Sequence, residues 1–307
     1  MKERERTEYC PAGLPCVSIG MPVFNGERYL ESALDSLLAQ TYSDFELIIV
    51  DNASTDRSPE IARAYAAKDS RLRYYRNEKN IGTAGNWYRA FELSSAEYFK
   101  WAADDDLYEP EFIARCFKAL DDNPSAIACY TSAKIIDAEG NFVRDLEVQI
   151  DTASAKPHVR LYNAIGIDYL CVQMYSVMRS SALRRVARYE GYYGWDRNAL
   201  AEICLLGPVL ELPERLFLHR LHPNSGGSVL HFGRPLSDLE EMDPGVNWKL
   251  ELSGLNASAL TRFGNYFRAI ERAPFSRLEK LRCHEEIVRL VAEKSLTRIK
   301  RLRSARH

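Results

Sequence analysis

Apolar residues in the first 125 positions follow two patterns: short continuous runs, and stretches in which they recur every three to four residues. The runs are rich in β-branched and aromatic residues and predict buried strands at residues 17–21, 45–50, 72–75 and 98–103. The periodic stretches predict helices that begin near Gly26, Ser58, Thr83 and Pro110. This alternation is typical of an α/β fold, so we expect a Rossmann-like, mainly parallel sheet flanked by helices.

The pattern is less regular in the second half of the chain. Further strands are predicted at residues 126–136, 171–178 and 209–218, with a hairpin turn at residues 137–140 and a helix at residues 197–206. From Ala257 to the end the spacing predicts helices. We divide the chain into a flexible tail (1–15), a main domain (16–227) and a C-terminal helical extension (228–307).

Charge separates this extension from the body of the chain. The 307 residues carry a formal net charge of −2, yet residues 257–307 hold 13 Lys or Arg and only 5 Asp or Glu. An acidic body with a basic tail lacks the even basic footprint of a nucleic-acid-binding protein, so we expect no nucleic acid as partner. The basic helices are interpreted either as a peripheral contact with anionic lipid or as a solvated helix end.

The seven cysteines are scattered and form no CxxC motif, which favours free thiols. The charged N-terminus shows no apolar segment of the kind found in a signal peptide. The longest apolar stretch contains polar and charged residues, so no membrane span is predicted. We therefore expect a cytoplasmic protein, either in solution or peripheral at the inner face of the membrane.

Three polar loops follow predicted strands, at residues 22–25, 51–56 and 104–106. Ligands of open α/β sheets bind beyond the carboxyl ends of the strands, so these loops should lie side by side. The adjacent carboxylates of Asp104, Asp105 and Asp106 repel one another, and a divalent cation such as Mg²⁺ or Mn²⁺ would compensate them. The alternative is a solvated acidic turn before a helix.

The loop at 51–56 also has two interpretations. Its carboxylate and amide oxygens could bind a base or a ribose, but such residues also cap helices and form turns. The chain has no GxxxxGK[ST] motif, no GxGxxG after the first strand and no GxSxG. These absences disfavour P-loop, dinucleotide and α/β-hydrolase chemistry.

Four segments together resemble the family 2 glycosyltransferases of the GT-A fold. They are VSIGMPVFN (17–25), LIIVDNASTD (47–56), Asn80-Ile81-Gly82 and ADDDLYEP (103–110). The resemblance covers about residues 15–227 and implies a nucleotide-binding half at about 16–125 and an acceptor half at about 126–227. It also implies an inverting enzyme that uses Mn²⁺ or Mg²⁺ to transfer a sugar from a nucleotide-diphosphate donor.

The resemblance also assigns residues to the donor. Pro22, Phe24 and Asn25 match the first nucleotide loop, and Asp51 and Asn52 match the acidic pair that grips the base. The second position of that pair is usually Asp, so Asn52 leaves the base open, with UDP as the expected nucleotide.

The Asp-rich loop matches the Asp-x-Asp region of the family. Asp105 is then the metal ligand, Asp104 a ribose or metal-water partner, and Asp106 the cap of the next helix. The family usually has another Asp where this chain has Ala103.

On the acceptor side, the segment Gly194-Trp195-Asp196 resembles the position of the catalytic base of the family. Asp196 would take the proton of the acceptor hydroxyl, and it could also be the N-cap of the helix at Arg197. Tyr193 and Trp195 are either an acceptor floor or a packed corner. The segment around His222 resembles a loop that closes over the diphosphate, with Arg220 on phosphate and His222 as metal or phosphate ligand.

The sequence thus predicts an inverting glycosyltransferase that acts on a saccharide or lipid-linked acceptor, in cell-surface polysaccharide or glycolipid synthesis. Two alternatives remain open. A nucleotidyltransferase would release pyrophosphate, whereas a non-catalytic nucleotide-sugar-binding protein would bind the donor without transfer or hydrolysis.

Overall fold

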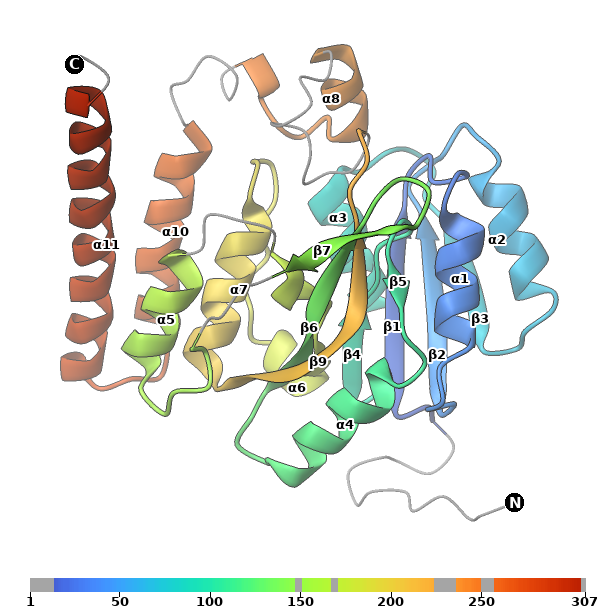
Figure 1. The fold of residues 1–307 in the computed structure, drawn as a ribbon, viewed down its shortest axis with the longest axis horizontal. Helices are drawn as coiled ribbons and strands as arrows, with labels where there is room; N and C mark the ends of the chain where they lie inside the picture. Colours follow the sequence, from blue (N-terminus) through green and yellow to red (C-terminus); the bar gives the residue numbers. More distant parts are fainter. Residues whose placement is uncertain (1–13, 147–150, 167–170, 224–235, 250–256, 305–307) are drawn as a thin grey trace.

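The computed structural model describes residues 14–146, 151–166, 171–223, 236–249 and 257–304 (Figure 1). The nine strands form one mixed sheet in the order β3-β2-β1-β4-β8-β6-β9-β5, with β7 paired to β6. The strands are β1 Val17–Val23, β2 Phe45–Asp51, β3 Leu72–Arg76, β4 Tyr98–Trp101, β5 Leu107–Tyr108, β6 Ala128–Ile136, β7 Phe142–Leu146, β8 Val177–Arg179 and β9 Val209–Arg220.

The first four strands pair in parallel, as predicted. Their connecting helices are α1 Leu30–Leu38, α2 Ser58–Ala66 and α3 Thr83–Glu92, and α4 Phe112–Asp122 follows β5. Parallel strands place their carboxyl ends on one edge, so the loops after β1, β2 and β4 lie on the same edge of the sheet. The second half is mostly antiparallel, with β4–β8, β6–β8, β6–β7 and β5–β9 pairs and one parallel pair, β6–β9.

The remaining helices cover the second half and extend beyond it. They are α5 Pro157–Gly166, α6 Ser180–Leu183, α7 Trp195–Leu206, α8 Leu236–Met242, α10 Ala257–Arg272 and α11 Arg277–Ser304, with a 3₁₀ turn, η1, at Val172–Tyr175. The long helices α10 and α11 lie beside α5 and α7 at one side of the molecule, and α11 is the outermost element (Figure 1). Among the described residues, no helix combines the length and the apolar content that a membrane crossing requires.

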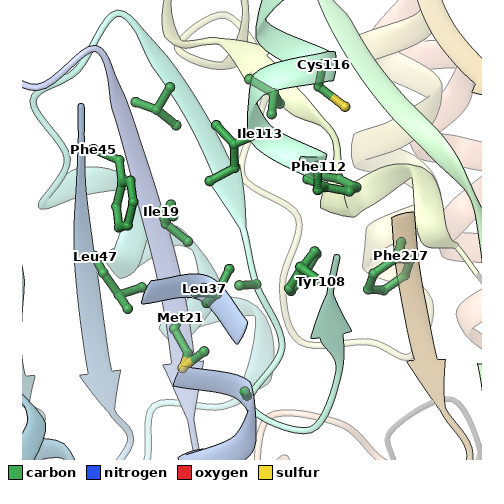
Figure 2. Packing of buried hydrophobic residues seen from close by; sticks show 14 of the residues in the cluster. Ile19, Met21, Leu37, Phe45, Leu47, Tyr108, Phe112, Ile113, Cys116 and Phe217 are labelled. Atoms are coloured by element: carbon green, nitrogen blue, oxygen red, sulfur yellow. The ribbon is translucent and has the colours of Figure 1, made fainter. Parts of the chain in front are cut away.

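The largest core cluster joins the two halves of the sheet. Ile19 and Met21 of β1 and Leu47 of β2 lie in one cluster with Leu37 of α1, Phe112 of α4 and Phe217 of β9 (Figure 2). Tyr108 of the short strand β5 stacks on Phe217, with ring centroids 5.1 Å apart. This contact fixes the chain directly after the Asp-rich loop, so a late strand of the sequence supports an early loop.

Three local expectations are corrected by the structure. Residues 171–178 are not one strand: η1 comes first and β8 is short, because an apolar run is buried equally well in either geometry. The first exit loop is shorter than predicted, since β1 continues through Pro22 to Val23. Cys116, Cys129, Cys171, Cys204 and Cys283 are free, but Cys16 is disulfide-bonded, and no spacing motif announces that bond.

Candidate active site

The first two polar loops are joined by hydrogen bonds beyond the ends of β1 and β2. The amide of Asn25 donates to the Ser54 hydroxyl (3.0 Å), and the Asn25 side-chain oxygen accepts from the amide of Thr55 (2.8 Å). The amide of Gly26 donates to the Ser58 hydroxyl (2.9 Å). Asn25 has a left-handed backbone (φ 53°), which Asn tolerates better than most residues. The two loops therefore form one surface, as the sequence predicted.

The Asp-rich loop lies directly against the first loop. A Cβ atom added to Gly26 would stand 2.1 Å from a carboxylate oxygen of Asp104, so this carboxylate occupies the space that the glycine leaves. Burial, together with the neighbouring charge of Asp105, raises the pKa of Asp104 well above its ordinary range. The expectation that the three loops lie side by side is confirmed.

Asp51 ends β2 and is 1% exposed. Its carboxylate accepts hydrogen bonds from the Ser54 amide (2.8 Å), the Tyr74 hydroxyl (2.7 Å) and the guanidinium of Arg76. A buried carboxylate requires such partners. These contacts fix the position of the Asp51 carboxylate at the edge of the first two polar loops.

Asn52 is equally buried and organises a group of amide side chains. Its oxygen accepts from Asn77 (3.0 Å) and from the Ile81 amide (2.9 Å), and its nitrogen donates to Asn80 (2.7 Å). An amide side chain both donates and accepts hydrogen bonds, whereas an ionised carboxylate only accepts them. The departure from Asp at this position therefore has a structural reason, because Asn52 ties the second loop to the segment before α3.

His222 contacts the Asp-rich loop on its other side. Its Nε2 atom lies 2.9 Å from a carboxylate oxygen of Asp105. The Arg220 guanidinium donates to the backbone carbonyl of Asp105 (2.7 Å), and its charge lies over the Tyr29 ring, 4.7 Å from the centroid. The Tyr29 ring also contacts the His222 ring (4.6 Å between centroids) and the Arg28 guanidinium (5.0 Å to the centroid). The structure thus brings Asp105, Arg220 and His222 together, as the sequence analysis required of a diphosphate and metal site.

Asp106 has a different role from the one predicted. It is fully buried, accepts from the Arg220 amide (2.8 Å) and lies 3.1 Å from His219 Nδ1. The next helix begins after β5, and its N-cap is Glu111. The prediction of a helix cap is wrong, because Asp106 instead fastens the end of β9 to the Asp-rich loop.

The donor set around Asp105 fits a divalent cation. Within the described part of the chain, no three His, Cys, Asp or Glu side chains gather as a ready metal cage. Mg²⁺ and Mn²⁺ in nucleotide sites commonly use only one or two protein ligands and take the rest from phosphates and water. The Tyr29 hydroxyl beside His222 is also buried without a hydrogen-bond partner in the described structure, as expected of a site that receives a polar ligand.

Asp196 lies in the first turn of α7, where the N-cap is Gly194, so the capping interpretation of Asp196 is wrong. Burial raises the pKa of the Asp196 carboxyl above its ordinary range. Burial, together with the charges of Asp106, Asp105 and Asp196, raises the pKa of the Tyr175 phenol. The Tyr175 ring packs on Phe217, which supports the Asp-rich loop, and on Trp87, which contacts Trp195 beside Asp196.

The two predicted acceptor aromatics differ in exposure. Trp195 is 7% exposed and packs on Trp87 and Tyr88, with centroids 5.5 and 5.6 Å away. This burial favours the packed-corner interpretation for Trp195. Tyr193 is less buried and packs against Trp248, with centroids 5.6 Å apart.

The segment 236–249 adds contacts that sequence reasoning missed. Asn80 donates to the backbone carbonyl of Glu241 (2.7 Å), and Asp243 accepts from the backbone and side chain of Thr83 at the start of α3. A few residues later, Trp248 packs on Tyr193. The segment thus links the start of α3 to Tyr193, and no local motif marks either contact.

Gly26 allows a direct test of the loop geometry. Gly26→Ala is expected to lower the affinity for UDP about tenfold while costing no more than about 1 kcal/mol of stability, because the displaced group is the Asp104 carboxylate and not backbone. Titration calorimetry and urea unfolding measure the two effects. Gly264→Ala is the control, since its added Cβ meets no atom within 4 Å. Unchanged UDP affinity in Gly26→Ala would remove Asp104 from the donor site.

The three polar loops lie at the carboxyl edge of the parallel strands, where α/β proteins of this class bind their ligands. Residues 18–187, more than half of the chain, match the family described as glycosyl transferase family 2. The chain therefore belongs to glycosyl transferase family 2.

Curated relatives agree with this membership. An uncharacterized glycosyltransferase of Rickettsia typhi is 36% identical over 129 residues, 41% of this chain and 39% of that protein. The putative glycosyltransferase EpsH of Bacillus subtilis is 32% identical over 124 residues, 40% of this chain and 36% of the relative. This chain thus spans less than half the length of these relatives. An uncharacterized glycosyltransferase of Haemophilus influenzae is 25% identical over 223 residues, 70% of this chain and 68% of the relative.

Solved structures share the fold. TarS of S. aureus (residues 1–349), in complex with UDP-GlcNAc, has a TM-score of 0.55 and 17% identity, covering 84% of this chain and 81% of that one. The same protein in complex with UDP has a TM-score of 0.54 and covers 89% of this chain and 88% of that one. The predicted α/β fold of GT-A type with a C-terminal helical part is confirmed.

Proposed function

We propose that this chain transfers a sugar, with inversion, from a UDP-sugar to a hydroxyl acceptor in the synthesis of a cell-surface polysaccharide or glycolipid. One observation carries the proposal: the Asp-rich loop lies against the first nucleotide loop and contacts His222 on its other side. Family membership supports the transfer, and the complexes of TarS with UDP and UDP-GlcNAc support the choice of nucleotide.

The donor occupies the surface formed by the first two loops. Phe24 and Asn25 stand beyond the end of β1, and Asp51 ends β2 beside them. Pro22 and Asn52 are buried behind this surface and set its shape. Asp104 faces the ribose from the third loop, and its position against Gly26 supports this role.

Asp105 and His222 hold Mn²⁺ or Mg²⁺, which when bound offsets the negative charge that develops on the leaving diphosphate. Arg220 pairs with the diphosphate, and its contact with the Asp105 carbonyl keeps its guanidinium at the loop. Asp196 removes the proton of the acceptor hydroxyl as this oxygen attacks the anomeric carbon. Tyr193 and Trp195 shape the acceptor side next to Asp196.

Calorimetric titration with UDP, GDP, dTDP and CDP, each with and without Mn²⁺, tests the donor site. We expect Mn²⁺-dependent binding of UDP and at least a ~10-fold loss of affinity in Asp105→Asn. The matched control is Asp122→Asn, an exposed carboxylate of α4 that pairs only with Lys118 among the described residues. Equal UDP affinity with and without Mn²⁺ would contradict the metal site.

The reaction itself distinguishes the alternatives. Incubation with a UDP-sugar and a mixed glycolipid fraction is expected to release UDP. Release of pyrophosphate from a nucleoside triphosphate would indicate a nucleotidyltransferase. Tight binding of the donor without UDP release would indicate a binding protein on the same fold.

A further inference from the structure

The helices α10 and α11 expose most of the large apolar side chains on the described surface. Of ten such side chains, six belong to this pair: Leu260, Phe267, Leu278, Leu281, Val288 and Val291. Between the two helices lies a groove of about 640 Å³ lined only by apolar side chains, among them Leu260, Phe263, Phe267, Ile287 and Val288. We call it the hairpin groove. Exposed apolar surfaces of this kind mark binding sites for proteins or membranes.

This exposed face is not the one that holds α11 to the protein. Cys283 and Leu290 form the inner face and are buried in a cluster with residues of α5, α7 and α10; Ile287, 1% exposed, belongs to this cluster and also lines the groove. The inner face is sufficient to pack α11 against the protein. Leu281 and Val288 are additional apolar side chains of α11, and they are 53% and 62% exposed. α11 is the outermost element (Figure 1), and the exposed side chains of Leu278, Leu281 and Val288 show that it also carries apolar surface outside this cluster.

The charge of the extension selects the occupant. Residues 257–307 carry a net charge of +8, and the last 14 residues hold six Lys or Arg and no Asp or Glu. Arg282 and Arg289 of α11 have side chains 50% and 57% exposed but pair with glutamates of the same helix, so the excess of positive charge lies mainly in those last 14 residues. A second copy docked on this face would bring two such positive helices together, whereas anionic lipid headgroups attract them. Basic residues beside an exposed apolar face are the composition of helices that lie in a lipid interface.

We propose that the hairpin groove and the basic end of α11 dock this protein on an anionic lipid bilayer. The end of α11 lies at the same end of the molecule as α8, which precedes the contacts of Asp243 and Trp248 with the site (Figure 1). Docking through this end would place α8 close to the bilayer. The docking does not depend on the proposed sugar transfer, but it would give the transferase a lipid-linked acceptor at its own surface.

Flotation of the full chain with phosphatidylcholine vesicles, with and without about 30 mol% phosphatidylglycerol, tests the proposal. We expect at least ~10-fold stronger partitioning onto the anionic vesicles, decreasing as salt is added. Leu260→Ser with Val288→Ser keeps the charge and is expected to weaken partitioning at least ~10-fold. The matched control is Phe142→Ser with Val143→Ser, since these β7 side chains are 61% and 54% exposed but lie outside the hairpin.

Three outcomes would overturn the proposal. The first is equal partitioning of the chain onto neutral and anionic vesicles. The second is a hairpin variant that floats like the control variant, with thermal unfolding showing that both are folded. The third is that light scattering detects a dimer and that the hairpin substitutions dissociate it. In that case the groove would be an interface between two copies of the chain. UDP binding, measured in the same variants, is expected to be unchanged, which separates this proposal from the proposed function.

Discussion

Replacing Asp196 by Asn is expected to lower kcat for sugar transfer by ~10²- to 10⁴-fold, the range that a positioned general base contributes. The amide keeps the shape of the side chain in the first turn of α7 but cannot accept the proton of the acceptor hydroxyl. UDP affinity is expected to change less than about twofold, because the contacts proposed for the donor come from the loops after β1, β2 and β4 and not from α7. Initial rates and calorimetry on the same preparation separate the two effects.

The pH profile provides a second test of the same carboxylate. Burial raises the pKa of Asp196, and only the ionised form can act as base. Activity should therefore be full above this raised pKa and fall as the pH drops through it, so the acid limb of kcat should lie above the ordinary carboxyl range. Glu190→Gln is the control, an exposed carboxylate on the preceding loop that pairs with Arg188. An Asp196→Asn enzyme with wild-type rates would assign the base to another group.

Replacing Lys100 by Met is expected to stabilise the protein by about 2 kcal/mol near pH 6. Lys100 is fully buried in β4, and burial lowers its pKa to about 7 from 10.5. At a pH where Lys100 is protonated in both the folded and the unfolded protein, that pKa difference corresponds to a cost of about 5 kcal/mol for burying the charged ammonium group. Met would lose the hydrogen bond to the Trp101 carbonyl (2.9 Å) and the contact with the Tyr108 ring (3.8 Å), which offset part of the gain.

The sign of the pH dependence is specific to this lysine. Above about pH 7 the folded state releases the proton while the unfolded state keeps it, so the stability of the wild type should rise with pH by up to ~1.4 kcal/mol per unit. In Lys100→Met this part of the slope should vanish. Urea unfolding between about pH 6 and 9 measures it. Lys118→Met, at an exposed position, should retain the slope, and a wild-type slope in Lys100→Met would contradict the assignment.

The donor half was predictable because its signals are local. Each strand there is a short apolar run that ends in a polar loop. Because parallel strands have their carboxyl ends at the same edge of the sheet, these loops are expected to lie together. The sequence analysis also anticipated one long-range pair, the contact between Asp105 and His222. That prediction came from the family resemblance and not from the spacing of apolar residues.

The missed features depend on contacts between distant parts of the chain. Asp106 was assigned to the next helix because the sequence did not reveal β5. This strand has only two residues, too few to show an alternating pattern, and its partner strand β9 begins a hundred residues later. The role of Asn52 depends on amides at 77 and 80 that become neighbours only when the loops fold together. Glu241 and Asp243 lie in a short helix and its exit, where the sequence gives no reason to expect contact with residues 80–83.

The segment 236–249 is hydrogen-bonded to Asn80 before α3 and packs on Tyr193 through Trp248. If the donor of the proposed reaction tightens the Asn80 contact, Trp248 is restrained as well, and donor and acceptor would then share one conformational equilibrium. Thermodynamic reciprocity then applies: whatever factor the donor adds to the affinity for the acceptor, the acceptor must add to the affinity for the donor. The order in which the substrates bind is in that case a property of Leu236–Met242 and the residues after it, rather than of either binding loop alone.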